Sequence, residues 1–283
     1  MLKVALTHDI DRTSKTYQYL THFIKALIKK DFKSAIYHLS TYNNRNSVYW
    51  NFDEIMSIEN YYGVKSTFFF LIESIPLKII DYKTWQLAIG RYDIYEPRIV
   101  DIIRYLDNNG WEIGLHGSYR SFKSLDLLNH EKRTLEEIVG HKIIGIRQHY
   151  LNLSESSWII QQNAGFLYDT SFGYNDKIGF KDDIISAFRP NNNEFTVFPM
   201  AIMDFCYLNT SNRIDKLKKI IGKIIANRSV LVINWHNNVY NEKEYPGYRN
   251  AYVEIIEICK SYDAFFDTLQ NFYYDSDVEK GNY

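Results

Sequence analysis

Short apolar runs that alternate with helical segments are the feature of this sequence that most constrains its fold. Residues 67–71 form an unbroken run of Thr, Phe and Leu, which is typical of a β-strand buried on both faces. Comparable short runs lie at 3–6, 111–115, 142–146, 166–170, 195–199 and 229–235, most of them separated by helical segments. Alternating strands and helices predict an α/β fold, with a parallel sheet or barrel and helices outside it.

The composition agrees with one ordinary globular unit. The chain has 283 residues, of which 46% are hydrophobic and 24% charged, enough for a sizeable core. No internal repeat or low-complexity linker divides it. We therefore expect a single domain over residues 1–273, followed by a polar tail over residues 274–283.

Net charge, apolar runs and cysteines limit the compartment and the partners. The formal net charge is -1, which argues against a nucleic acid or a membrane surface as the main partner. No apolar run approaches the roughly 20 residues of a membrane span. Because Met1 leads directly into a strand-like run with no signal peptide, we expect a cytoplasmic protein. Cys206 and Cys259 fit a reducing compartment, although a single disulfide stays open. The oligomeric state cannot be predicted.

Three segments between the strands carry structural expectations. Residues 13–30 are expected to form a helix capped by Thr13 or Ser14. Residues 74–95 have mixed character and are expected to be an insertion at a strand end, and residues 175–193 are expected to be a loop. Six apolar side chains share one face of the helix expected at 13–30: Tyr17, Leu20, Phe23, Ile24, Leu27 and Ile28.

Two carboxylates follow the first apolar run. If the strand continues, its side chains alternate, so Asp9 and Asp11 point the same way, whereas His8 and Ile10 point the other way. Two acids on one face of a strand end suit a metal ligand beside a general base. A polar loop that caps a helix would look the same.

Further polar residues follow the carboxyl ends of other predicted strands. His116 ends one of them, Arg147 and His149 follow another, and His236 follows a third. In a parallel barrel this end is where sites are built. Each residue alone fits a loop histidine or a salt-bridge arginine, but their recurrence in separated segments favours a shared site.

Other motifs narrow the chemistry. Asp204, the one acid in an apolar stretch, is either a buried cap or an orienting partner for a histidine. Cys206 and Cys259 have no convincing histidine partner in the sequence, which argues against thiol catalysis. No Gly-rich phosphate loop and no Gly-x-Ser-x-Gly turn is present, which argues against nucleotide hydrolysis and serine hydrolase chemistry.

The order of these motifs resembles the polysaccharide deacetylase family, also known as carbohydrate esterase family four. The resemblance extends over roughly residues 2–259 and implies a distorted parallel (β/α) barrel of about seven strands. It implies that Asp9 is the catalytic base and Asp11 a metal ligand. Arg147 would orient the base, and the backbone N–H at Tyr150 would help to stabilise the oxyanion.

The same resemblance assigns the remaining roles and exposes one departure. His116 matches the first metal-binding histidine, His236 the general acid, and Asp204 the acid that supports it. The family has a second histidine four residues after the first, where this chain has Arg120, which stays protonated and cannot ligate a metal. Either fewer protein groups hold the metal, or His149 substitutes, or the metal is lost.

The resemblance thus implies a hydrolase that depends on a divalent metal such as zinc and removes an N-acyl group from a sugar or glycan. With the cytoplasmic expectation, a precursor in surface-polysaccharide biosynthesis is the predicted substrate. The alternative is a degenerate, non-catalytic carbohydrate-binding protein of the same fold. An ester or cyclic-amide hydrolase is a third option.

Overall fold

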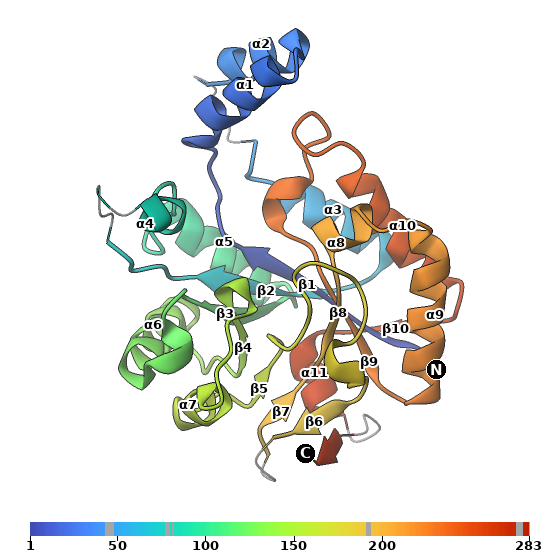
Figure 1. Ribbon diagram of the computed structural model, residues 1–283. Coiled ribbons are helices and arrows are strands. Elements are labelled where there is room, and N and C mark those ends of the chain that lie inside the picture. Colours follow the sequence, from blue (N-terminus) through green and yellow to red (C-terminus); the bar gives the residue numbers. More distant parts are fainter. Residues whose placement is uncertain (43–47, 77–79, 81, 191–193, 276–279, 283) are drawn as a thin grey trace.

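The fold is a curled, mainly parallel β-sheet with helices on its outer face (Figure 1). A computed structural model of the chain describes residues 1–42, 48–76, 80, 82–190, 194–275 and 280–282. The strands in chain order are β1 (Lys3–Ile10), β2 (Ser66–Leu71), β3 (Glu112–Gly117), β4 (Gly145–Gln148), β5 (Tyr168–Asp169), β6 (Ala187–Arg189), β7 (Thr196–Val197), β8 (Met200–Met203), β9 (Val230–Asn234), β10 (Phe265–Phe266) and β11 (Lys280–Asn282).

The helices connect these strands in alternation. They are α1 (Gln18–Ile28), α2 (Phe32–Ser40), α3 (Phe52–Tyr62), α4 (Tyr82–Ala88), α5 (Pro97–Asn108), α6 (Leu125–Val139), α7 (Ser157–Asn163), α8 (Asp204–Leu208), α9 (Arg213–Ala226), α10 (Tyr248–Lys260) and α11 (Leu269–Tyr274), with short 3-10 turns at Ser121–Lys123, His149–Leu151, Lys181–Asp183 and Asn237–Val239. None of the helices in the described part of the chain is both long and apolar enough to cross a bilayer.

The sheet order is β11-β6-β7-β5-β4-β3-β2-β1-β9-β8, with β10 beside β1. All pairs from β7 to β8 along this order are parallel, whereas β6 runs antiparallel to β7. An isolated parallel bridge joins Gly173 to Met200 and brings the β8 end of the sheet back toward β5. The predicted distorted parallel (β/α) barrel is confirmed, with β6, β10 and β11 as additional short strands.

Side chains of β1 alternate between two cores, as a period of two requires. Ala5 belongs to the core inside the curled sheet, whereas Leu6 and Ile10 belong to the core between the sheet and the outer helices. His8 also points outward and contacts Glu59 of α3 at 2.9 Å, with both side chains fully buried. His8 thus lies on the face opposite Asp9, as the alternation predicts, and has a structural contact there.

Helix α11 fills one end of the curled sheet. Its Leu269 and Phe272 belong to the inner core, the backbone N–H of Leu269 donates to Thr67 Oγ1, and that of Gln270 donates to Glu112 Oε2. Thr67 and Glu112 lie at the amino-terminal ends of β2 and β3. The opposite, carboxyl-terminal end is thus left for a site.

Several predicted boundaries are wrong. The first strand runs to Ile10 rather than ending at residue 6, so Asp9 lies within it. The fourth run is paired at Gly145–Gln148 rather than at 142–146, because the parallel register with β3 joins Leu115 to Ile146. Helix α1 begins only at Gln18, with Tyr17 rather than Thr13 or Ser14 at its cap.

The prediction of a loop is wrong in part, and the predicted insertion and the predicted tail also contain regular elements. The predicted loop at 175–193 contains β6, and the predicted insertion at 74–95 contains α4. In the predicted tail, β11 pairs with β6. Residues 77–79, 81, 191–193, 276–279 and 283 of these segments lie outside the described residues, and the domain boundary at residue 273 stays a prediction.

Gly114 permits close packing between β3 and the inner core. A Cβ atom at this position would lie 2.5 Å from the ring of Phe69. We expect Gly114→Ala to lower the free energy of unfolding by about 1–3 kcal/mol, because the overpacked ring must move. Gly222→Ala in α9 is the matched control: no atom lies within 4 Å of its added Cβ, and helix propensity predicts a gain of about 0.5–1 kcal/mol. Equal urea midpoints for the two variants would contradict this packing.

Candidate active site

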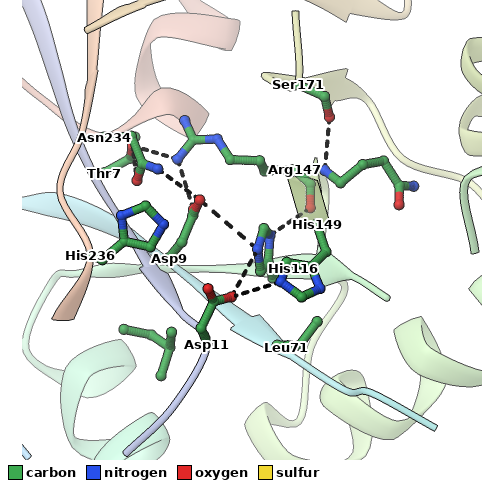
Figure 2. Close-up of polar contacts among 12 residues, drawn as sticks. Thr7, Asp9, Asp11, Leu71, His116, Arg147, His149, Ser171, Asn234 and His236 are labelled. Carbon is green, nitrogen blue, oxygen red and sulfur yellow. Dashed lines mark hydrogen bonds and ion pairs between the residues drawn. The ribbon is translucent and has the colours of Figure 1, made fainter. Parts of the chain in front are cut away.

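The parallel register brings polar side chains from separate strands to one end of the sheet (Figure 2). Asp9 of β1 pairs with Phe69 of β2, and His116 of β3 lies between Leu71 of β2 and Arg147 of β4. Asp9, His116 and Arg147 thereby reach a common buried region, as the sequence predicted for carboxyl strand ends.

Asp9 is held between two hydrogen-bond donors. Arg147 Nη1 donates to its Oδ1 at 2.9 Å, and Asn234 Nδ2 donates to its Oδ2 at 2.7 Å. Burial raises the pKa of Asp9, but the charges of Arg147, His116 and His236 outweigh burial and hold that pKa below its ordinary value. Asp9 therefore stays ionised at neutral pH in a fixed orientation.

Arg147 is itself fixed from several sides. Its side chain is fully buried, Nη1 also donates to Thr7 Oγ1 at 2.7 Å, and Nε donates to the carbonyl of Thr170 at 3.1 Å. The guanidinium lies 4.7 Å from the centroid of the Phe69 ring. These contacts leave Arg147 one orientation, with Nη1 directed at Asp9.

Asp11, His116 and His149 form a three-residue cluster beside Asp9. Asp11 Oδ1 lies 3.3 Å from His116 Nε2 and 3.5 Å from His149 Nε2 (Figure 2). These three ligand atoms lie within 4.8 Å of one another. His116 Nδ1 donates to the carbonyl of Arg147 at 2.9 Å, which leaves Nε2 as the free ligand atom.

The chemistry of this cluster fits a divalent metal. Asp11 Oδ1 is buried and makes no hydrogen bond among the described residues. Burial lowers the pKa of His149 and favours the neutral imidazole that a metal requires. Two imidazoles and one carboxylate are a known catalytic zinc set. Of the three alternatives that the sequence left open, substitution by His149 is the one that places a third ligand atom beside Asp11 and His116, whereas Arg120 is exposed to solvent.

His236 and Asp204 form a second pair at the same end of the sheet. Asp204 Oδ2 accepts from both the Nδ1 and the backbone N–H of His236, each at 2.8 Å. Burial lowers the pKa of His236, but Asp204, together with Asp11 and Asp9, raises it to about 10. His236 is therefore protonated at neutral pH, with Nδ1 bound to Asp204 and Nε2 left for another partner.

A cavity of about 380 Å³ joins these groups. Arg147 and Asp204 do not line it but contact residues that do: Arg147 contacts Asp9 and His116, and Asp204 contacts His236. The side chain of Tyr150 is 48% exposed, and its backbone has φ 60°, which the short turn after β4 imposes. The lining residues are Asp9, Asp11, His116, Gln148, His149, Tyr150, Leu151, Asn175, Met203 and His236.

Asn234, Arg91 and Glu73 are not among the residues expected from the sequence, but they contact the candidate base or the candidate metal ligands. Asn234 is the last residue of β9, two residues before His236. Its position at a strand end could have indicated that it belongs to the site. Arg91 Nη2 lies 3.4 Å from His149 Nε2, and Arg91 Nη1 donates to the Asp11 carbonyl at 2.8 Å. Glu73 Oε2 lies 3.8 Å from His149 Nδ1. Arg91 and Glu73 come from the segment 74–95 or its edge, where no periodic pattern indicated a site.

Three other histidines and the two cysteines lie apart from this site. His141 is half-exposed and contacts Asp107. His22 Nδ1 and His38 Nδ1 lie 3.4 and 3.6 Å from the carboxylate of Glu244, respectively. Both cysteines are free and buried, so the disulfide alternative is not realised.

Comparisons with solved structures identify the fold. A provisionally assigned polysaccharide deacetylase from Mycobacterium smegmatis superposes with a TM-score of 0.58 at 17% identity, covering 96% of this chain and 88% of that chain. A similarly assigned polysaccharide deacetylase from Pseudomonas aeruginosa PAO1 gives 0.58 at 13% identity, covering 96% and 89%. The chain has the fold of a polysaccharide deacetylase.

The deacetylase fold is shared by proteins that carry another name. A PuuE allantoinase superposes with a TM-score of 0.59 at 14% identity, covering 96% of this chain and 89% of that chain. No family model and no curated protein sequence matches the chain. At such low identities the likeness concerns the fold, and it confirms the predicted family resemblance at that level.

The Asp9–Arg147 pair makes a testable contribution to stability. We expect Arg147→Met to lower the free energy of unfolding by about 3–5 kcal/mol, because it leaves the buried Asp9 carboxylate without its cation. The same substitution in an Asp9→Asn background is expected to cost much less. Arg133→Met, at an exposed arginine of α6, is the control. Equal costs of Arg147→Met in both backgrounds, measured by urea unfolding, would contradict the pairing.

Proposed function

We propose that this protein is a metal-dependent hydrolase that removes an N-acyl group, such as acetyl, from a sugar or glycan. The observation that carries the proposal is the convergence of three groups on one cavity: an ionised Asp9, the Asp11–His116–His149 cluster and a protonated His236. The polysaccharide-deacetylase fold supports the substrate class.

Asp11, His116 and His149 would hold the metal, with zinc the expected ion from this donor set. When bound, a divalent metal supplies Lewis acidity, which makes water more acidic and polarises a carbonyl group. Groups that contact the proposed ligands support the two histidines. The Arg147 carbonyl orients His116, and Glu73 lies beside the Nδ1 of His149.

Asp9 is proposed as the general base. It accepts the proton of the water that attacks the acyl carbonyl, and Arg147 with Asn234 keeps its oxygens directed into the site. His236 is proposed as the general acid that protonates the departing amine from Nε2, with Asp204 accepting from Nδ1 and orienting the ring. The backbone N–H at Tyr150 is proposed to stabilise the developing oxyanion.

The setting of the reaction stays a prediction. A precursor in surface-polysaccharide biosynthesis and a cytoplasmic location are the expected context. Release of acetate from intact cell wall, but not from free or nucleotide-linked N-acetyl sugars or from short N-acetylated oligosaccharides, would contradict it. The same panel, extended to esters and cyclic amides, distinguishes a deacetylase from the alternative of an ester or cyclic-amide hydrolase.

The proposed ligand set is tested by measuring zinc and acetate together. We expect the wild-type protein to bind stoichiometric zinc and to release acetate from at least one member of the sugar panel. Asp11→Ala and His149→Ala are expected to lose both, because each removes one of three protein ligands. His141→Ala, at a histidine outside the cavity, should retain both. No zinc under any metal supplementation, with glycan binding retained, would instead support the non-catalytic carbohydrate-binding alternative.

The His236–Asp204 pair predicts a pH dependence. A general acid must carry its proton, so activity should fall as the pH rises through the raised pKa of His236, which lies at about 10. Asp204→Asn removes the nearest charge that raises this pKa, so the alkaline limb of the kcat profile should move to lower pH by about one unit or more. The acid limb should stay in place. An unchanged alkaline limb, at equal zinc loading, would contradict the role of His236.

A further inference from the structure

Helices α1 and α2 form a hairpin that stands off the barrel (Figure 1). The two helices pack mainly against each other. The hairpin carries exposed apolar side chains on both helices, with Ile28 76% and Ile36 67% accessible to solvent. The exposed apolar residues, together the apolar face, are Leu20, Ile24, Leu27, Ile28, Phe32, Ile36, Leu39 and Tyr42.

The apolar face has the regular spacing of an amphipathic helix on each arm. On α1 it follows i, i+4, i+7 and i+8 from Leu20, and on α2 it follows i, i+4 and i+7 from Phe32. Such a stripe normally packs on the core of a globular protein. The apolar spacing expected for the first helix is thus present, but many of these side chains are exposed to solvent. A contiguous exposed apolar surface on a folded protein indicates an interaction surface.

Exposed basic residues lie in the same hairpin as the apolar face. Lys25, Lys29, Lys30 and Lys33 are all exposed, and the acidic residue between them, Asp31, accepts the backbone N–H of Ser34 as the cap of α2. The hairpin therefore combines four lysines with one aspartate, whereas the whole chain has a net charge of -1. The expectation that a membrane surface is not the main partner came from that average, which conceals this local concentration of positive charge.

The charges distinguish between two occupants of the apolar face. In a two-fold dimer the same surface of both copies meets, so the lysines of one copy would approach those of the other. Anionic lipid headgroups would instead neutralise the lysines while the apolar side chains enter the interface, as basic amphipathic helices do. Charge complementarity thus favours a lipid surface.

We propose that the α1–α2 hairpin docks this protein on an anionic membrane surface. The apolar face lies in the interfacial layer, and the lysines contact the headgroups. This surface is separate from the catalytic cavity, so the proposal does not depend on the proposed reaction.

Buried contacts connect the hairpin to the rim of the barrel. Lys15, just before α1, forms an ion pair with Glu244 and a 2.9 Å contact with His38 of α2. His22 of α1 lies 3.4 Å from the same glutamate. Glu244 follows His236 in the chain, and Lys15 follows Asp11. The docked hairpin would therefore hold the cavity near the membrane surface.

The test is cosedimentation of the full chain with vesicles of phosphatidylcholine alone or of phosphatidylcholine with phosphatidylglycerol. We expect binding to the anionic vesicles only, weakened by salt. Ile28→Asp/Ile36→Asp and Lys29→Glu/Lys33→Glu should each lower the partition constant by about tenfold or more. Ile159→Asp on α7 and Lys218→Glu/Lys219→Glu on α9 are matched controls at exposed positions and should bind as the wild type does.

Circular dichroism and urea unfolding should be unchanged in all variants, because the substituted side chains are exposed. Failure of the wild type to bind anionic vesicles would overturn the proposal. Light scattering would then show whether the wild type is a dimer. A dimer that Ile28→Asp/Ile36→Asp dissociates would indicate that a second copy covers the apolar face instead. Equal vesicle binding by hairpin variants and controls would also overturn it.

Discussion

The buried ion pair between Asp9 and Arg147 is the interaction on which the rest of the site depends. Taking two charges out of water is costly, and here Asn234, Thr7 and Thr170 satisfy the remaining hydrogen-bonding groups. The pair connects β1 to β4 across the interior of the curled sheet. Because the Arg147 carbonyl also orients His116, the proposed base and the proposed metal cluster share one support.

Much of the site could be predicted because parallel strands end together. The alternation within β1 placed Asp9 and Asp11 on one face and His8 on the other, which is where the structure has them. The strand-end positions of His116, His149 and His236 likewise predicted a common cavity. Roles within that cavity came from the family resemblance and remain proposals, since the solved structures establish a common fold only.

The rest could not be predicted because local patterns do not determine tertiary contacts. Arg91 and Glu73 reach the site from a segment with no periodicity. The amphipathic period of α1 is real, but a period alone does not specify whether a core, a partner or a lipid surface covers the apolar side chains. The strand end at Gln148 depends on register with β3, which the apolar run at 142–146 does not encode.

We propose that His149 takes the role of the family's second metal-binding histidine, at whose position this chain has Arg120. Anomalous diffraction from a zinc-soaked crystal tests it most directly. We expect one peak bonded to Asp11 Oδ1, His116 Nε2 and His149 Nε2, with Zn–N distances of about 2.0–2.1 Å. A peak that lacks His149 as a ligand, or a His149 ring turned away from the ion, would contradict it.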